Sequence, residues 1–109
     1  MLFTKTVAQG FLVMFVILSL AQGPSYGNAI IKNIYELTGF WKPSPGSMYP
    51  ALQKLRKQKL IEIKRKEKKI YYQLTKEGEK FLKKIDESKP ELIKNLEALL
   101  SSLKMVKSK

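Results

Sequence analysis

Residues 41–55 read WKPSPGSMYPALQKL, and this stretch decides the fold. It has a stiff, proline-rich start, and Ser44 is expected to cap a helix that carries Pro45 at its first position. Proline is tolerated there because the N–H that it lacks has no partner in a first helical turn. The inward face is predicted from apolar residues that recur at helical spacing, Met48, Leu52 and Leu55, flanked by Ala51.

The opposite face of this predicted helix is polar and basic. It carries Ser47, Pro50, Gln53, Lys54 and Lys57, with Tyr49 near its edge. In a helix-turn-helix, the second helix lies in the major groove of DNA and reads bases with its N-terminal residues. We therefore expect Ser47 and Tyr49 to contact the duplex, and Lys54 and Lys57 to reach its phosphates.

An apolar stripe before this stretch predicts another helix over residues 26–37, capped by Ser25. Gly39 is the expected stop of this helix. Phe40 and Trp41 are expected to fill the core between the two helices; the alternative for Trp41 is a platform for a ligand. The buried stripe of the earlier helix is predicted to be Ile30, Ile31, Ile34 and Leu37.

Two runs of alternating apolar and polar residues follow and predict a β-hairpin. The inward residues are Ile61 and Ile63 in the first strand, and Ile70, Tyr72 and Leu74 in the second. Residues 65–69 are expected to join the strands. A basic tip beside a recognition helix is typical of a wing that touches DNA, here through Lys66, Lys68 and Lys69. The alternative is a lysine-rich edge that discourages aggregation.

The chain carries a formal net charge of +12, from 21 Lys and Arg residues against 9 acids. The segment 54–69 alone holds nine of the basic residues and two of the acids. Such a bias indicates a polyanionic partner, either nucleic acid or an anionic membrane surface. The alternative is a lysine-rich surface with no such partner, as in many thermophile proteins.

The N-terminal region has no charged residue between Lys5 and Lys32. Its apolar run fits the outline of a secretory signal peptide, but it is too short for a membrane span of about 20 apolar residues. We favour a helix that is buried on nearly all sides. Thr6 and Gln9 form a capping-box pattern at its start, and Gly23-Pro24 marks its stop.

The C-terminal region is predicted to be helical and to associate with a second copy. Thr75 is expected to cap a helix, Ser88 and Glu91 form another capping-box pattern, and Pro90 predicts a kink or short break beside them. An apolar heptad seam follows. It either folds back onto its own domain or, as we favour, forms a two-fold dimer with the first helix. We assign to this dimer Phe11, Phe15, Leu18, Leu92, Leu96, Leu99 and Leu103.

The composition argues against several chemistries. The chain contains no Cys and no His, so thiolate nucleophiles, disulfides, imidazole bases and the usual zinc sites are excluded. It also contains no glycine-rich phosphate loop. We therefore expect no enzymatic activity, no metal and no cofactor.

The motifs described so far resemble those of the PadR family of transcriptional regulators. The matching segments are Gly23-Pro24-Ser25-Tyr26-Gly27, residues 41–52, Leu60-Ile61 and Tyr72-Gln73-Leu74-Thr75-Lys76-Glu77-Gly78. The resemblance implies a winged helix-turn-helix, a C-terminal dimerisation helix and repression of target promoters. It also implies a contact of Tyr26 with the DNA backbone. The DNA contacts that it implies in the recognition helix are Ser44, Ser47, Tyr49, Pro50 and Lys54.

Two features limit what the resemblance implies about ligands. Some small members of the family bind flat aromatic drugs through a C-terminal tryptophan. The tryptophan of this chain is Trp41, which lies inside the shared motif. Drug binding is therefore not expected, and the sequence identifies no small-molecule effector, although it leaves room for one.

The sequence predicts a mostly α fold with a small β-hairpin, divided into a winged helix-turn-helix (residues 1–75) and a helical dimerisation region (residues 76–109). We predict a cytoplasmic, homodimeric regulator, a repressor, that binds a palindromic DNA site and no membrane. The alternatives are a sequence-blind architectural DNA binder and a secreted or membrane-anchored basic protein. The candidate DNA contacts are Tyr26, Lys42, Ser44, Ser47, Tyr49, Pro50, Gln53, Lys54, Lys57, Lys66, Lys68 and Lys69.

Overall fold

The computed structural model of the 109-residue chain describes residues 2–106, with their side chains from residue 10 onward. Five helices and one antiparallel hairpin make up this part of the chain. In chain order they are α1 (Leu2–Leu20), α2 (Gly27–Thr38), α3 (Pro45–Lys57), β1 (Ile61–Lys66), β2 (Lys69–Leu74), α4 (Lys76–Glu87) and α5 (Lys89–Lys104). The predicted fold class, mostly α with a β-hairpin in a winged helix-turn-helix, is confirmed.

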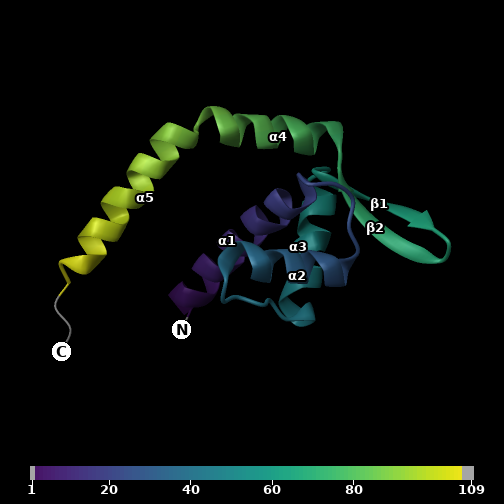
Figure 1. The fold of residues 1–109 in the computed structure, drawn as a ribbon, viewed down its shortest axis with the longest axis horizontal. Coiled ribbons are helices and arrows are strands. Elements are labelled where there is room, and N and C mark those ends of the chain that lie inside the picture. Colours follow the sequence, from purple (N-terminus) through teal and green to yellow (C-terminus); the bar gives the residue numbers. More distant parts are fainter. Residues whose placement is uncertain (1, 107–109) are drawn as a thin grey trace.

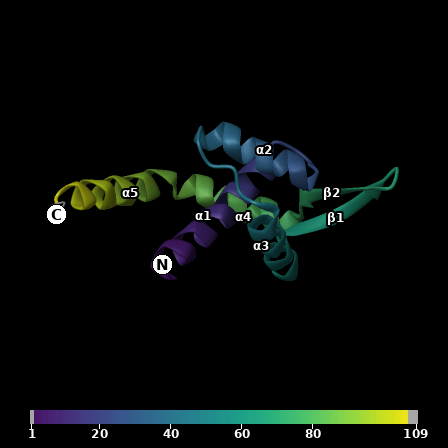
Figure 2. The ribbon, with the colours of Figure 1, turned by 90° about the horizontal axis from the view of Figure 1, so that it is seen from below.

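The first three helices pack together, and the hairpin projects from one side of them (Figure 1). Helix α4 runs across α1, and α5 then extends away from the domain toward the side opposite the hairpin (Figure 2). The long dimension of the molecule, 54 Å, results from these two projections. The hairpin and α5 are therefore the parts of the chain best placed to reach other molecules.

The core lies between α1, α2 and α3 and is closed on one side by the base of the hairpin. Its buried side chains are Leu12, Val16, Ile17, Leu20, Ile30, Ile31, Ile34, Met48, Leu52, Leu55, Ile61 and Tyr72. Ser19 is also buried, and its Oγ accepts a hydrogen bond of 3.0 Å from Asn33 Nδ2. This bond satisfies the buried hydroxyl of Ser19 among its apolar neighbours.

The start of α1 differs from the prediction. The helix already begins at Leu2, so Thr6 and Gln9 lie inside it and do not form its N-terminal capping box. A local capping pattern is overridden here because the preceding residues continue the helical hydrogen bonds. The predicted stop is confirmed, since α1 ends at Leu20 and Gly23 adopts a φ of 135°.

Two predicted core positions at the end of α2 are wrong. Leu37, in the last turn of α2, is 47% exposed, and Phe40, in the connection after this helix, is 83% exposed, so neither side chain is buried in the core. Trp41 does fill the core as predicted, and its ring meets that of Phe15 edge-to-face at 5.9 Å. Gly39 ends the helix in the left-handed conformation, with a φ of 81°.

Ser25 does not cap α2, as the sequence had suggested. The residue before the helix is Tyr26, and its side chain makes no capping hydrogen bond. Ser25 instead pairs with Tyr72 through backbone hydrogen bonds of 3.0 and 2.8 Å, which adds a single bridge to the hairpin. The segment between α1 and α2 is thereby tied to the base of β2.

The chain leaves α3 through a residue with left-handed backbone conformation that is not a glycine. Lys59 has a φ of 62°, its N–H donates to the carbonyl of Arg56, and the N–H of Leu60 donates to the carbonyl of Leu55. These two bonds form a Schellman motif, whose left-handed position is usually glycine. The motif turns the chain directly from the recognition helix into the first strand of the hairpin.

The two C-terminal helices meet at the predicted break. Thr75 caps α4, since its Oγ1 accepts a hydrogen bond of 3.0 Å from the N–H of Gly78. Ser88 separates α4 from α5, but its side chain makes no capping bond, so the predicted second capping box is wrong. Helix α5 contains no buried residue and does not fold back onto its own domain. Within residues 2–106, no helix combines the length and apolarity needed to cross a bilayer.

Candidate nucleic-acid interface

Helix α3 divides into a buried face and an exposed face, as predicted. Met48, Leu52 and Leu55 are at most 1% exposed and anchor the helix in the core. The opposite face is open to solvent and carries the predicted contact residues Ser47, Tyr49, Pro50, Gln53, Lys54 and Lys57. The helix is thus held by one side and offers the other to a ligand.

The first turn of α3 is built from its cap. Ser44 Oγ accepts from the N–H of Ser47 at 3.3 Å and donates to Ser47 Oγ at 3.2 Å, and Pro45 occupies the first turn. Pro50, one turn later, lacks the N–H that an α-helix would direct at the carbonyl of Gly46. This exposed turn therefore combines helix N-terminal N–H groups, which favour anions, with a carbonyl that has no donor from its own helix.

The exposed face of α3 stands between two grooves, one toward the hairpin and one toward α1. We call this face the ridge of α3. The groove toward the hairpin has a volume of about 560 Å³ and is lined by Gln53, Arg56 and Lys57 on the side of α3. The groove toward α1 has a volume of about 490 Å³, and Lys54 and Ser47 lie on its rim. A ridge of this kind can enter a DNA major groove, which is about 12 Å wide.

Tyr49 connects the starts of α2 and α3. Its side chain is 45% exposed, and its hydroxyl lies over Gly27, the first residue of α2. A Cβ atom at Gly27 would lie 2.6 Å from Tyr49 Oη, so any residue other than glycine would displace the tip of this tyrosine. The Tyr-Gly pair at residues 26–27 thus has a steric role in addition to the contact of Tyr26 implied by the resemblance.

Tyr26 lies at the base of the hairpin and contacts Tyr71 of β2. The two hydroxyls are hydrogen-bonded to each other, and the rings are tilted by 32° with their centroids 4.2 Å apart. This hydrogen bond, followed by partial desolvation, raises the pKa of Tyr26 above its ordinary value. The phenol is therefore neutral, and a potential donor, at physiological pH.

The hairpin is longer and its turn is tighter than predicted. The strands continue to Lys66 and resume at Lys69, so residues 65–69 do not form a loop as expected. Glu67 and Lys68 alone make the turn, with φ angles of 52° and 66°. Two positive φ values indicate a type I′ turn, which fits the twist of paired strands.

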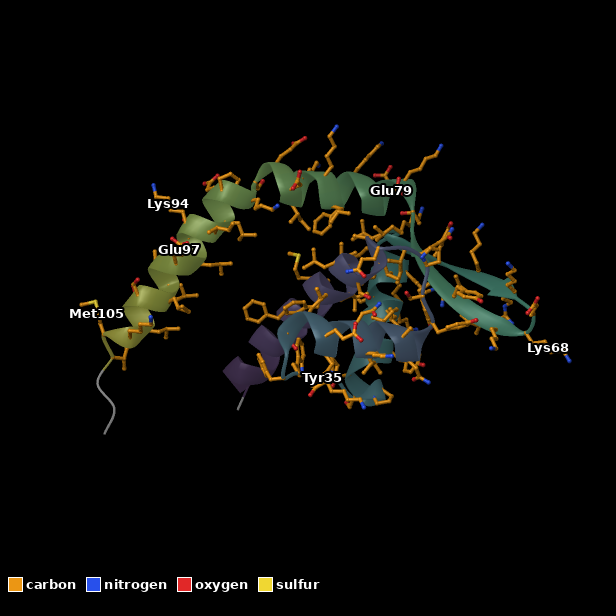
Figure 3. The ribbon with its side chains drawn as sticks, viewed as in Figure 1. Tyr35, Lys68, Glu79, Lys94, Glu97 and Met105 are labelled. Carbon is orange, nitrogen blue, oxygen red and sulfur yellow. The ribbon has the colours of Figure 1, made fainter. Side chains whose placement is uncertain are left out.

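The tip of the hairpin exposes the predicted wing residues Lys66, Lys68 and Lys69. Lys68 lies at the far end and points away from the domain (Figure 3). Ile70, predicted to face inward, is 39% exposed because the strands extend beyond the core that they cover at their base.

The acidic residue at the base of the hairpin is neutralised locally. Glu62 Oε1 accepts a hydrogen bond of 2.6 Å from Gln73 Nε2 and lies 4.0 Å from Lys64 Nζ. Residues 54–69 all lie in the described part of the chain, and Lys64 and Glu62 form the only ion pair among them. The basic side chains of α3 and the hairpin are otherwise available to an external anion.

Lys42 lies apart from the ridge of α3. It is exposed in the connection between α2 and α3, where it lines a hollow together with Lys32 and Tyr35 of α2. Lys42 therefore lines a different hollow from Lys54 and Lys57, which line the two grooves beside the ridge.

Sequence reasoning missed three residues that belong to this surface. Arg56 lines the groove between α3 and the hairpin, and Lys64 and Tyr71 lie along the strands. A helical wheel of α3 could have identified Arg56. The strand residues required the register of the hairpin, which a turn without Gly or Asn does not reveal.

The predicted dimer residues are exposed to different degrees in the single chain. On α1, Phe11 is 48% exposed, whereas Phe15 and Leu18 are partly buried against their own domain. On α5, the exposed fractions of Leu92, Leu96, Leu99 and Leu103 are 40, 44, 55 and 60%. These leucines form an apolar stripe that their own domain does not bury, and α5 itself extends away from the domain (Figure 1).

Comparison with known proteins identifies relatives of this chain. The family model described as "Transcriptional regulator PadR-like family" matches residues 16–84. A transcriptional regulator from Clostridium thermocellum is 30% identical, with 94% of this chain and 96% of that chain covered and a TM-score of 0.72. A PadR-like transcription factor from Bacteroides fragilis is 26% identical, with 91% and 99% covered and a TM-score of 0.71.

A PadR-like transcriptional regulator from Bacillus cereus is 28% identical to this chain, with 92% of this chain and 97% of that chain covered and a TM-score of 0.67. No curated protein sequence matches the chain significantly. Each of these three regulators matches more than nine tenths of this chain, whereas the family model matches residues 16–84.

Proposed function

Because the chain belongs to the PadR-like family of transcriptional regulators, we propose that it is a sequence-specific DNA-binding repressor that acts as a homodimer. The observation that carries the proposal is the ridge of α3, which is anchored by a fully buried face and bordered by two grooves whose linings include Lys54, Arg56 and Lys57. A DNA-binding regulator of this kind works in the cytoplasm and needs no catalytic step, metal or cofactor.

In the proposed complex, α3 enters the major groove. Ser47, Tyr49, Pro50 and Gln53 lie along the part of the helix that approaches base edges, while Ser44 and the first turn face a phosphate. Lys54 and Lys57 reach the flanking phosphates. The hairpin follows the neighbouring backbone through Lys66, Lys68 and Lys69, which makes binding depend steeply on salt concentration.

We further propose that α1 and α5 form the two-fold interface. The apolar stripe of α5 is half exposed in the single chain, and a second copy offers the same stripe for isologous packing. A two-fold dimer presents two copies of α3, so the binding site is a palindrome. Its half-sites lie about one helical turn, roughly 34 Å, or a multiple of this distance apart.

Sedimentation analysis tests the interface. Leu99→Glu places a charge in the middle of the α5 stripe and should shift the protein from dimer to monomer at micromolar concentration. Ser101→Glu is the matched control, because it adds the same charge on the opposite side of α5. A wild-type monomer, or equal dimerisation of the two variants, would contradict the proposed interface.

Selection from a pool of random DNA duplexes at about 0.15 M salt tests the function as a whole. We expect enrichment of a palindrome, since each subunit reads one half-site with the same residues. Binding without enrichment would identify a sequence-blind architectural protein instead. Absence of binding would refute the proposal and return the N-terminal apolar run to consideration as a secretion signal.

A further inference from the structure

Three polar head groups from two distant parts of the chain meet on one face of the hairpin. The hydroxyls of Tyr26 and Tyr71, which are 45 residues apart, are hydrogen-bonded, and Lys69 Nζ lies 5.4 Å from the centroid of the Tyr26 ring. A lysine at this distance over an aromatic face gains a cation–π attraction. The fold thus gathers two phenols and an ammonium group on one side of β2.

The strand register places further basic residues on this same side. Tyr71 pairs with Lys64, and Lys69 pairs with Lys66. Because side chains alternate between the two faces of a hairpin, these four residues share the face that carries Tyr26. We call it the Tyr26 face. The opposite face carries Ile61, Ile63, Arg65, Ile70, Tyr72 and Leu74.

The two faces of the hairpin differ in burial and in charge. The opposite face begins in the core, where Ile61 is 2% and Tyr72 is 8% exposed, and Arg65 is its basic residue. The Tyr26 face carries Lys64, Lys66 and Lys69 along its length, against the single acid Glu62. The hairpin is therefore asymmetric in charge, and a polyanion is attracted more strongly to the Tyr26 face.

The paired phenols provide a donor suited to a phosphate. In the pair, one hydroxyl donates to the other, so one hydroxyl hydrogen remains available for an external acceptor. Phosphodiester oxygens only accept hydrogen bonds, and a charged acceptor makes such bonds stronger. The ammonium of Lys69 adds a positive charge beside this donor.

We propose that Tyr26, Tyr71 and Lys69 form one binding site for a DNA phosphate, and that the duplex backbone lies along the Tyr26 face of the hairpin. The site rests on the proposed DNA-binding function and adds Tyr71 to its contacts. The paired backbone hydrogen bonds between Ser25 and Tyr72 hold the two tyrosines together before DNA arrives.

The experiment uses the full chain and the duplex selected above, or random duplex if no sequence is enriched. Tyr71→Phe removes one hydroxyl and no charge. We expect about tenfold weaker binding to specific and random DNA alike, with an unchanged dependence on salt. Lys69→Ala should weaken binding and reduce the salt slope by about one.

Arg65→Ala is the matched control, because it removes the same charge from the opposite face of the same strands. We expect it to change affinity less than twofold. Ethylation of single phosphates provides a second readout. One phosphate in each half-site should interfere with binding of the wild-type protein and become silent with Tyr71→Phe.

Two results would overturn this site: binding of Tyr71→Phe with wild-type affinity and interference pattern, or an equal loss for Arg65→Ala and Lys69→Ala. Either result leaves the proposed function intact, since the wild-type protein still binds DNA. Failure of the wild-type protein to bind any duplex would instead refute the proposed function, and this site with it.

Discussion

Tyr49 packs directly over Gly27, so adding a single methyl group at residue 27 tests whether this contact positions Tyr49. In Gly27→Ala, the new Cβ would lie 2.6 Å from Tyr49 Oη and 3.2 Å from Tyr49 Cζ. An unstrained contact is about 3.5 Å, so the tip of Tyr49 must retreat by roughly 1 Å. The perturbation therefore moves a proposed DNA contact without substituting any residue of α3.

The effect on stability should be small because two terms oppose each other. Overpacking costs about 1–3 kcal/mol in a closed core, but Tyr49 is 45% exposed and can relax toward solvent, so we expect the low end. Alanine in place of glycine in a helix contributes about 0.5–1 kcal/mol in return. The free energy of unfolding in urea should thus stay within about 1 kcal/mol of wild type. DNA affinity should fall about tenfold, because the displaced Tyr49 loses its proposed hydrogen bond to DNA.

Gly10→Ala is the matched control, because a Cβ at Gly10 in α1 meets no atom within 4 Å. It should increase stability and leave DNA binding unchanged. The double variant Gly27→Ala/Tyr49→Phe removes the closest clashing atom, so its stability should exceed the sum of the single effects by about 1 kcal/mol. Additive stabilities, or unchanged DNA affinity of Gly27→Ala, would refute the steric reasoning.

Three further predictions concern the fold. Gly78→Ala should destabilise the protein by at least about 3 kcal/mol in urea unfolding, because its Cβ would lie 2.1 Å from the carbonyl oxygen of Leu60; a loss below about 1 kcal/mol would contradict this packing. Lys59→Gly should raise the free energy of unfolding by about 0.5–1 kcal/mol, since glycine adopts the φ of 62° without strain, and a decrease would argue against the Schellman geometry. Burial raises the pKa of Tyr72, so its neutral phenol contributes stability that is complete below about pH 10 and is lost as the pH rises through the folded-state pKa. Tyr72→Phe should therefore unfold at a higher alkaline pH than wild type, whereas Tyr35→Phe, at an exposed position, should not.

The parts of the site that are local in sequence could be predicted. Ser44, Pro45 and the spacing of Met48 and Leu52 define α3 within a few residues, because capping and helical periodicity are short-range effects. The buried strand residues followed from alternation in the same way, except near the tip, where Ile70 extends beyond the core.

The parts that depend on contacts between distant residues could not be predicted. Nothing in the sequence pairs Tyr26 with Tyr71, or places Tyr49 over Gly27, because these contacts arise only when α2, α3 and the hairpin pack together. Local signals also failed where the tertiary structure overrides them. Ser25 joins the hairpin instead of capping α2, and its backbone is satisfied by β2.

The central claim is that α3 reads sequence while the hairpin holds the backbone. The most direct measurement is the ratio of affinities for the selected operator and random DNA at one salt concentration, in wild type, Tyr49→Phe and a Lys68→Ala/Lys69→Ala variant. The ratio should fall for Tyr49→Phe and stay unchanged for the double lysine variant, which loses affinity for both duplexes equally. An unchanged ratio for Tyr49→Phe, or a reduced ratio for the lysine variant, would contradict this division of roles.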